Sequence, residues 1–199
     1  MINKTIGSLA EIGVGLVLRR KQADLESGSK HLYESLTLKS FNPQGWIEKE
    51  YLDSFESSEI LEDRYLSVKG DVIIKLTPPY TAVAITDDTS GYVVPSQFII
   101  IRISDKDLNS EYLALYLNSE KTKKHILITA TGMTVPMIKT GTLKNFEVPI
   151  LSASRQEKIS EISRLIIKER HLLDKMVSEK EKYYQALTEA IIKEKEEND

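Results

Sequence analysis

The C-terminal quarter of the chain is a long stretch without any helix-breaking residue. Residues 154–197 contain neither glycine nor proline, so nothing in this stretch ends a helix. Residues 154–157, Ser-Arg-Gln-Glu, match a capping box, in which the serine and glutamate side chains accept hydrogen bonds from unpaired amides. At 1.5 Å for each residue, about 40 helical residues span roughly 60 Å. Because this length exceeds the diameter of a 150-residue domain, we expect part of the helix to project.

A heptad seam runs along this predicted helix. Alternating steps of three and four residues select ten positions, and eight of them are apolar, as the pairing of two helices requires. The two exceptions, Glu169 and Lys180, have opposite charges. The predicted interface positions are Ile159, Ile162, Ile166, Glu169, Leu173, Met176, Lys180, Tyr183, Leu187 and Ala190.

The two charged positions favour one register for two antiparallel copies. When Glu169 of one copy faces Lys180 of the other, the apolar positions of the seam also face one another. A shift by one heptad buries each charge against an apolar residue, which costs free energy. We therefore predict an antiparallel homodimer through this helix. The alternative is that the seam packs on its own domain, which leaves half of the helix with no surface to cover.

The residues before this helix have the pattern of a sheet-rich domain. Runs of β-branched residues predict strands at 73–76 and 98–103, and weaker patterns suggest strands at 82–85 and 92–94. Residues 87–91, Asp-Asp-Thr-Ser-Gly, are typical of a turn.

A helix is predicted from about residue 110, where Asn109 or Ser110 can cap it and Glu111 suits its positive end. A last short strand is predicted at 146–150, and its Pro149 favours an edge position. The sequence thus predicts an α+β fold with two parts: a sheet-rich domain at 1–153 and a long coiled-coil helix at 154–199.

Composition excludes several classes of protein. The absence of cysteine removes disulfides and thiolate zinc sites. No apolar run is long enough to span a membrane, and the first residues lack a secretion signal, so we expect a cytoplasmic protein. The formal net charge of −3 argues against tight DNA binding by the chain alone.

We find no pattern that predicts catalysis or a metal site. The three histidines lie in unrelated contexts, and no nucleotide-binding glycine loop is present. Residues 77–80, Thr-Pro-Pro-Tyr, are similar to a motif of amino-methyltransferases, but threonine is a poorer acceptor there and the upstream glycine motif is missing. We interpret them as a turn that ends a strand and exposes a tyrosine.

Two basic clusters are candidates for contacts with DNA phosphates. The first is Arg19, Arg20 and Lys21, and the second is Lys121, Lys123, Lys124 and His125. For each cluster alone, a solvated basic face is the simpler interpretation. The loop around Gly132 and the segment 80–97 supply hydroxyls, amides and aromatic rings that suit base edges.

Seven short motifs carry a resemblance to a known family. They are LTLKS at 36–40, GDVII at 70–74, FIIIR at 98–102, YLALYLNS at 112–119, TGMTVPMI at 131–138, LKNFEVPI at 143–150 and RQEKI at 155–159. Each motif is weak alone, but in this order they resemble the specificity subunit of type I restriction–modification systems across nearly the whole chain.

The resemblance implies a non-catalytic subunit that recognises DNA. Members of that family usually have two target-recognition domains, each followed by a long helix, and each domain reads half of a split site. Methyltransferase and restriction subunits supply the catalysis, with S-adenosylmethionine, ATP and magnesium. This chain has one domain and one helix, so it resembles a half-subunit whose homodimer would read an interrupted palindrome.

Three alternatives remain at this stage. The chain can be a truncated or recombination-donor cassette that works only when joined to another half. It can be a scaffold whose helix recruits partners without DNA. It can also be an adenine methyltransferase, which would bind S-adenosylmethionine by itself.

The resemblance also implies roles for individual residues. Phosphate contacts would come from Arg19, Arg20, Lys21, Lys121, Lys123 and Lys124. Residues nearer the bases would be Tyr80, Tyr92, Gln97, Thr131, Met133 and Thr134.

Overall fold

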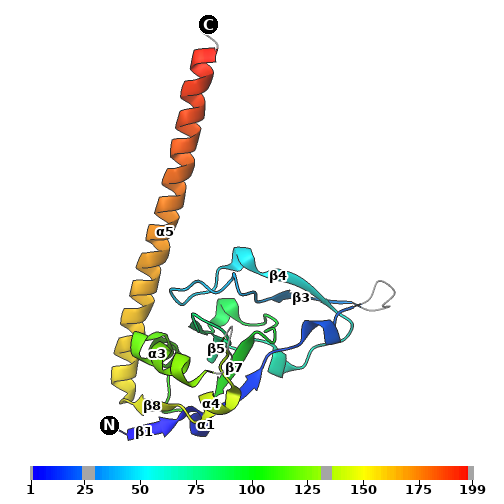
Figure 1. Ribbon diagram of the computed structural model, residues 1–199, viewed down its shortest axis with the longest axis vertical. Helices are drawn as coiled ribbons and strands as arrows, with labels where there is room; N and C mark the ends of the chain where they lie inside the picture. Colours follow the sequence, from blue (N-terminus) through cyan, green and yellow to red (C-terminus); the bar gives the residue numbers. More distant parts are fainter. Residues whose placement is uncertain (1, 24–29, 131–135, 197–199) are drawn as a thin grey trace. The chain divides into compact units, whose positions relative to one another are not determined.

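A computed structural model describes residues 2–23, 30–130 and 136–196 of the chain. Its contacts divide it into two compact units, Met1–Glu161 (unit 1) and Ile162–Asp199 (unit 2). The strands are β1 Ile2–Thr5, β2 Ala10–Val14, β3 His31–Ser35, β4 Asp53–Ser57, β5 Asp71–Lys75, β6 Ala82–Ala84, β7 Phe98–Ile103 and β8 Glu147–Ile150. The helices are α1 Ile6–Leu9, α2 Ser110–Asn118, α3 Glu120–Thr129, α4 Thr140–Lys144 and α5 Ala153–Glu196, with short 3-10 helices η1 Leu18–Arg20, η2 Lys49–Tyr51, η3 Asp63–Tyr65 and η4 Asp87–Thr89 (Figure 1).

A four-stranded antiparallel sheet in the order β2-β7-β5-β6 forms the centre of unit 1. Both of its faces are covered by apolar clusters. Because side chains alternate along each strand, one strand contributes residues to both clusters. On β5, Val72 and Ile74 belong to the main apolar cluster with α1, α2 and α4, whereas Ile73 belongs to a second cluster on the other face. On β7, Ile99 and Ile101 join the main cluster, while Phe98 and Ile100 join the second. Burial on both faces explains the continuous apolar runs from which these two strands were predicted.

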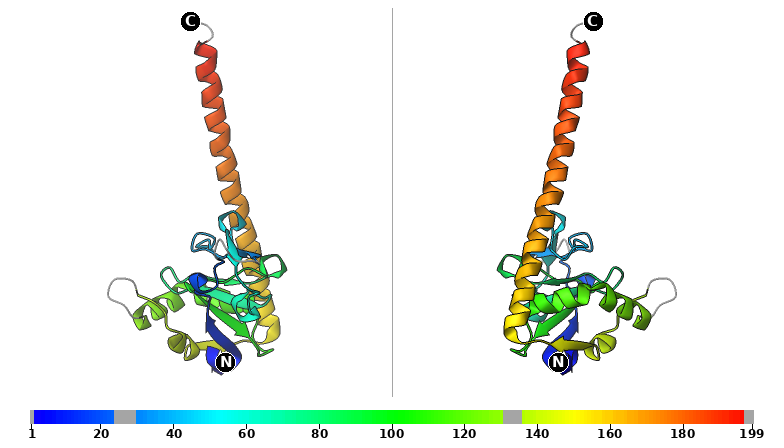
Figure 2. Two further views of the ribbon diagram at one scale, coloured as in Figure 1. Left: turned by 90° about the vertical axis from the view of Figure 1, so that its right-hand side faces the viewer. Right: turned by 90° about the vertical axis from the view of Figure 1, so that its left-hand side faces the viewer.

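Two smaller antiparallel pairs flank the central sheet. β1 pairs with β8, so that Ile2 faces Ile150 although they are separated by most of the chain (Figures 1 and 2). β3 pairs with β4. The predicted strands at 73–76, 98–103, 82–85 and 146–150 are confirmed within a residue or two at their ends. Residues 92–94 instead form only isolated bridges, through Val93.

Gly15 allows a close backbone approach just after β2. A Cβ atom at this position would lie 2.2 Å from the carbonyl oxygens of both Val94 and Pro95. The neighbouring Leu16 N–H donates a 2.7 Å hydrogen bond to the Val94 carbonyl oxygen. Only glycine fits here without a backbone shift, so packing requires glycine at this position.

A partly buried ion pair ties β7 to the first residue of β5, and further hydrogen bonds tie it to the segment before β5. Asp71 is 2% exposed, and both its carboxylate oxygens accept hydrogen bonds from Arg102, Oδ1 from Nε at 3.0 Å and Oδ2 from Nη2 at 2.8 Å. Arg102 Nη2 also donates to the Leu66 carbonyl oxygen at 3.0 Å, and the Val68 N–H donates to Asp71 Oδ2 at 3.0 Å. The hydrogen bond with Asp71 is the main cause that raises the pKa of Arg102.

The long helix is confirmed as α5, but its start differs from the prediction. It begins at Ala153, and the N–H groups of Arg155 and Gln156 donate to the carbonyl oxygen of Ser152. Ser154 therefore lies inside the first turn, and the predicted capping box at 154–157 is wrong. The α+β fold followed by one long helix is confirmed. Among the described helices, none has an apolar stretch long enough to cross a membrane.

Candidate nucleic-acid interface

Three segments that are distant in sequence meet where β5 ends. The Leu76 N–H donates to the Gln97 carbonyl oxygen at 3.0 Å, and the Ile138 N–H donates to the Leu76 carbonyl oxygen at 3.0 Å. The Tyr80 hydroxyl donates to the carbonyl oxygen of Pro136 at 3.0 Å. We call this region, residues 75–80, Gln97 and 136–138, the β5 end. It brings together two predicted base-reading residues, Tyr80 and Gln97, and the residues that directly follow 131–135 in the sequence.

The turn after β5 does not expose its tyrosine. A cis peptide bond joins Pro78 to Pro79, and Tyr80 has a φ of 52°. The two prolines are exposed, whereas Tyr80 is 2% exposed and belongs to the main apolar cluster. Burial also raises the pKa of its hydroxyl. The expectation of an exposed ring at Tyr80 is therefore wrong, because the left-handed backbone turns this side chain into the core.

Tyr92 is buried in a similar way, in the second apolar cluster. Its hydroxyl donates to the carbonyl oxygen of Asp88 at 3.3 Å. Neither tyrosine therefore offers its ring to a base in this structure. Gln97, in contrast, is exposed. Thr131, Met133 and Thr134 lie outside the described residues.

Lys75 is a buried cation that sequence reasoning missed. It is 8% exposed, and its Nζ donates to the carbonyl oxygen of Phe41 at 3.2 Å. Burial, and secondarily the charge of Lys123, lowers the pKa of Lys75. Burial also lowers the pKa of Lys123. Neither lysine forms an ion pair with another described residue, although the charge of Glu120 acts on Lys123. The β5 end thus holds the buried Lys75 without an ion-pair partner among the described residues.

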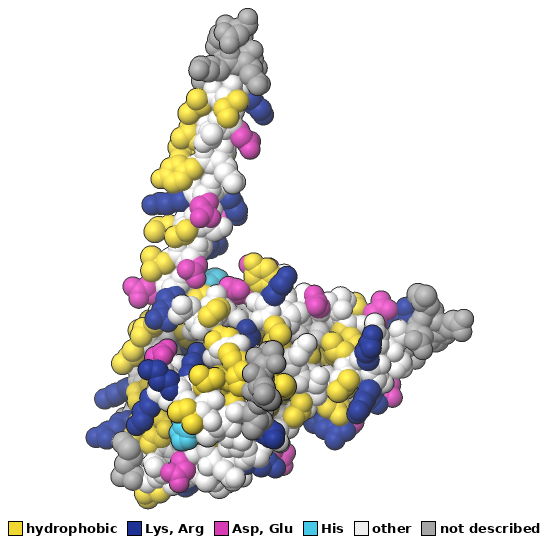
Figure 3. Space-filling view, viewed as in Figure 1, with side chains coloured by type: hydrophobic (Ala, Val, Ile, Leu, Met, Phe, Trp, Pro, Cys, Tyr) yellow, Lys and Arg dark blue, Asp and Glu magenta, His cyan; other side chains and the backbone are white. Residues whose placement is uncertain are grey.

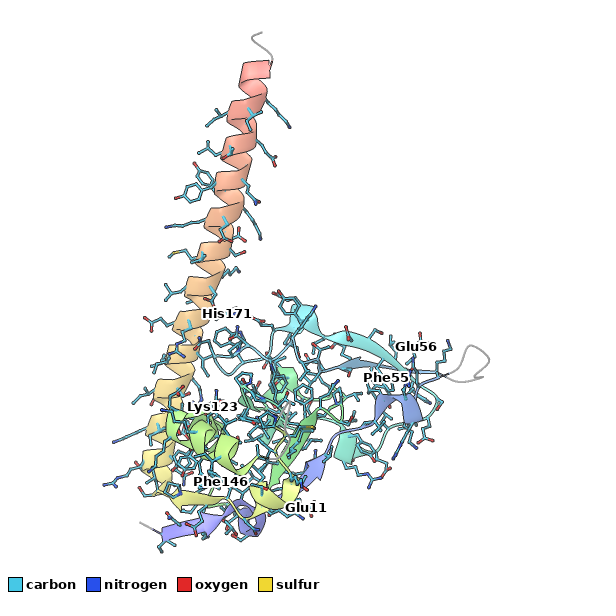
Figure 4. All side chains as sticks on the ribbon, in the orientation of Figure 1. Glu11, Phe55, Glu56, Lys123, Phe146 and His171 are labelled. Atoms are coloured by element: carbon cyan, nitrogen blue, oxygen red, sulfur yellow. The ribbon has the colours of Figure 1, made fainter. Side chains whose placement is uncertain are left out.

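Helix α3 presents the second predicted basic cluster. Ser119 caps it by accepting a hydrogen bond from the Thr122 N–H at 3.3 Å. Lys121 and Lys124 are three residues apart and both exposed, so they lie on one side of the helix. Lys123 also lies on α3, in the part of unit 1 that holds Phe146 (Figure 4).

The first basic cluster lies elsewhere in unit 1. Arg19 and Arg20 are exposed on η1. Lys21 forms an ion pair with Glu59, and that hydrogen bond raises the pKa of Lys21. In Figure 1, η1 and α3 appear on opposite sides of the central sheet, so the two clusters do not form one patch. The separation of the two basic clusters depends on the folded arrangement, so no pattern in the sequence indicates it.

The predicted seam of α5 begins later than expected. Ile159 is partly buried and packs against the main apolar cluster of unit 1, so it is not available to a second chain. From Ile162 to Leu187 the apolar seam positions are exposed, with fractions between 42% at Ile166 and 63% at Tyr183. Glu169 and Lys180 are exposed as well. Figure 3 shows hydrophobic side chains along this helix.

A family model matches this chain, and two solved structures share its fold. The family model described as the type I restriction modification DNA specificity domain matches residues 2–173. The fold is similar to a solved HsdS subunit from Thermoanaerobacter tengcongensis, with a TM-score of 0.61 and 14% identity over 94% of this chain and 46% of that one. It is also similar to a structure titled for complex assembly and conformational transition of the type I R-M system, with a TM-score of 0.57 and 16% identity over 94% of this chain and 43% of that one.

At these identities the two structures show a common fold and no more. The chain spans less than half the length of each. A search of curated proteins finds no match.

Proposed function

Because the chain belongs to the type I restriction modification DNA specificity domain family, we propose that it recognises a DNA sequence as the specificity component of a type I restriction–modification complex. The observation that carries this proposal is the family match over residues 2–173, which covers the sheet-rich unit and the first turns of α5 together. On this proposal the chain itself performs no chemistry. Methyltransferase and restriction subunits, with S-adenosylmethionine, ATP and magnesium, would modify and cleave the DNA.

The β5 end and the neighbouring α3 are the proposed DNA face of unit 1. The exposed Lys121 and Lys124 supply phosphate contacts, and Lys123 adds charge beside the buried Lys75. Gln97 is exposed at the same end of β5, and its amide can pair with the edge of a base. Positive charge around an exposed amide is the arrangement in which phosphate contacts position the protein and a side chain reads sequence.

Variants of this face separate affinity from specificity. Replacing Lys121 and Lys124 with alanine should weaken binding to every sequence and reduce the slope of log K against log salt by about 1.8, because two phosphate contacts are lost. Gln97→Ala should relax the choice of base at one position and keep the salt dependence. Lys69→Ala is a matched control, since this exposed lysine precedes the other end of β5 and pairs with Asp87 at 2.6 Å. Equal salt slopes for the double variant and the control would reject this face.

We further propose that two copies pair through α5 and read an interrupted palindromic site. The proposal is supported by the exposed apolar positions from Ile162 to Leu187 and by the opposite charges at Glu169 and Lys180. With Ile159 covered by unit 1, the pairing segment runs from Ile162 and keeps the register that places Glu169 opposite Lys180. A twofold axis between the copies relates the two DNA-reading units and hence the two half-sites.

Charge reversal tests this register by sedimentation of the full chain. Glu169→Lys places like charges together twice in each dimer, and we expect it to weaken self-association at least about tenfold, or 1.4 kcal/mol. Adding Lys180→Glu should restore association, because the opposite pairs form again. Glu181→Lys makes the same change in charge at a neighbouring position outside the seam and should have little effect. An unchanged association state in Glu169→Lys would exclude the register.

The whole function is tested by co-expression with methyltransferase subunits of type I systems. We expect the subunits to co-purify and to methylate a random plasmid library at one split site, read by sequencing of the methylated bases. A cassette that needs another half would methylate only after fusion to a second domain. A scaffold would co-purify without any sequence-dependent methylation. Binding of S-adenosylmethionine by the isolated chain would instead support an enzyme.

A further inference from the structure

The turn between β7 and α2 is a junction that several segments hold in place. The N–H groups of Ser104 and Asp105 both donate to the Leu9 carbonyl oxygen, at 3.0 and 3.1 Å. The Lys4 ammonium donates to Asp105 Oδ2 at 3.1 Å. At the end of this turn, Asn109 caps α2 by accepting hydrogen bonds from the N–H groups of residues 111 and 112, at 2.9 and 3.1 Å. The junction is thus fixed to α1 and β1.

Gln156, in the first turn of α5, reaches into this junction with its side-chain amide. It is 2% exposed. Its Oε1 accepts from the Asn109 N–H at 2.9 Å, and its Nε2 donates to the carbonyl oxygens of Asp107 at 2.7 Å and Leu151 at 2.9 Å. A buried amide with all these partners satisfied holds one orientation, because any rotation leaves polar groups unpaired.

A second contact lies one helical turn later. Ser160 is 0% exposed, and its hydroxyl donates to Asn109 Oδ1 at 3.1 Å. Gln156 and Ser160 are four residues apart, so they project from the same side of α5. Ile159, between them in the sequence, packs against the main apolar cluster. The first two turns of α5 therefore cannot rotate or slide on the junction without breaking hydrogen bonds at both ends.

We propose that Asn109, Gln156 and Ser160 are positioning residues that set the spacer length between the two half-sites. We call these three residues the junction clamp. The proposal rests on the proposed function, in which α5 pairs with α5 of a second copy. Under that arrangement, the direction in which α5 leaves its own DNA-reading unit decides where that unit meets the DNA.

The distance along α5 from the junction clamp to the centre of the pairing is long enough that a small change in the tilt of α5 shifts a half-site on the DNA. From Gln156 to the centre of the predicted pairing, near Asp174, the helix is roughly 28 Å long at 1.5 Å per residue. One base pair advances the duplex by about 3.4 Å. A tilt of about 7° at the clamp therefore displaces a half-site by roughly one base pair. A rigid clamp permits one spacer, and a loose clamp permits its neighbours.

The test measures spacer preference with full-length chains in complex with methyltransferase subunits. The DNA is a pool of duplexes that carry the two half-sites selected by the wild type, separated by spacers of different length. We expect the wild type to prefer one spacer over its neighbours by at least about tenfold, which corresponds to 1.4 kcal/mol. Gln156→Ala should reduce that preference to about threefold or less without changing which half-site bases are selected.

Two further variants separate positioning from folding. Ser160→Ala removes one hydrogen bond of the clamp and is the milder change, so it should remain folded and broaden the spacer profile in the same direction. Asn109→Asp retains an acceptor oxygen for all three hydrogen bonds made by Asn109 Oδ1, and it should keep the wild-type profile. Fluorescence of Trp46, the single tryptophan of the chain, reports whether unit 1 is folded in each variant.

The outcomes distinguish this inference from the proposed function. A wild-type complex that selects no DNA sequence contradicts both. A wild type with one spacer, whose preference is unchanged in folded Gln156→Ala and Ser160→Ala variants, contradicts the clamp alone. Altered half-site bases in these variants would also contradict it, because the clamp acts on spacing and not on base contacts.

Discussion

Removal of Arg102 should destabilise unit 1 more than removal of its partner Asp71. Asp71 is 2% exposed on its side chain and Arg102 is 32% exposed, so the carboxylate depends on the pair more than the guanidinium does. In Arg102→Met the Asp71 carboxylate keeps only its hydrogen bond from the Val68 N–H. The Leu66 carbonyl oxygen also loses its hydrogen bond from Arg102. Breaking a buried pair in this way costs about 3–5 kcal/mol, and the partial exposure of Arg102 favours the lower value.

Asp71→Asn should cost less, about 1–2 kcal/mol, because the arginine that it leaves behind reaches water. The decisive variant combines both changes. Adding Asp71→Asn to Arg102→Met removes the unpaired buried charge and should recover about 1–2 kcal/mol relative to Arg102→Met alone. Asp71→Asn and the double variant should therefore both lie between the wild type and Arg102→Met in stability.

Urea unfolding followed by Trp46 fluorescence is the appropriate assay. Trp46 belongs to unit 1, whereas circular dichroism would be dominated by α5. With a slope of about 2 kcal/mol per molar urea, a loss of 3 kcal/mol lowers the midpoint by roughly 1.5 M. Lys69→Met, which breaks an exposed pair with Asp87, should change stability by less than about 1 kcal/mol. If the double variant is less stable than Arg102→Met, the account of an uncompensated buried carboxylate is refuted.

Three other substitutions test further features of unit 1 with the same assay. Gly15→Ala should cost about 1–3 kcal/mol, because its Cβ would overlap two carbonyl oxygens, whereas Gly13→Ala, which has no atom within 4 Å, should be nearly neutral. Burial lowers the pKa of Lys75, so the folded state binds this proton less tightly than the unfolded chain, and stability should rise as pH approaches the unfolded value of 10.5. Lys75→Met should raise the midpoint at neutral pH and flatten this rise; a profile equal to the wild type would contradict the burial of the cation. Tyr80→Phe should cost about 1 kcal/mol through loss of the hydrogen bond to Pro136, and an unchanged midpoint would show that this bond contributes nothing.

Regular patterns in the sequence were sufficient for the elements whose stability is local or whose two faces are both buried. Helix α5 follows from a stretch without glycine or proline, and β5 and β7 follow from their β-branched runs. The start of α2 was also predictable, because Asn109 caps amides two and three residues away. In each case the determining residues lie next to one another in the chain, so periodicity and capping suffice.

Tertiary structure alone decided which of the candidate residues come together. The pairing of β1 with β8, the burial of Tyr80 and the proximity of Lys75 to Lys123 each depend on contacts between distant segments. The seam of α5 depends partly on the sequence and partly on tertiary packing. Its spacing and its two opposite charges are a property of the sequence, but its first position, Ile159, packs against the domain core. Helical periodicity specifies which side of a helix is apolar, and only packing against the rest of the chain decides how much of that side remains for a partner.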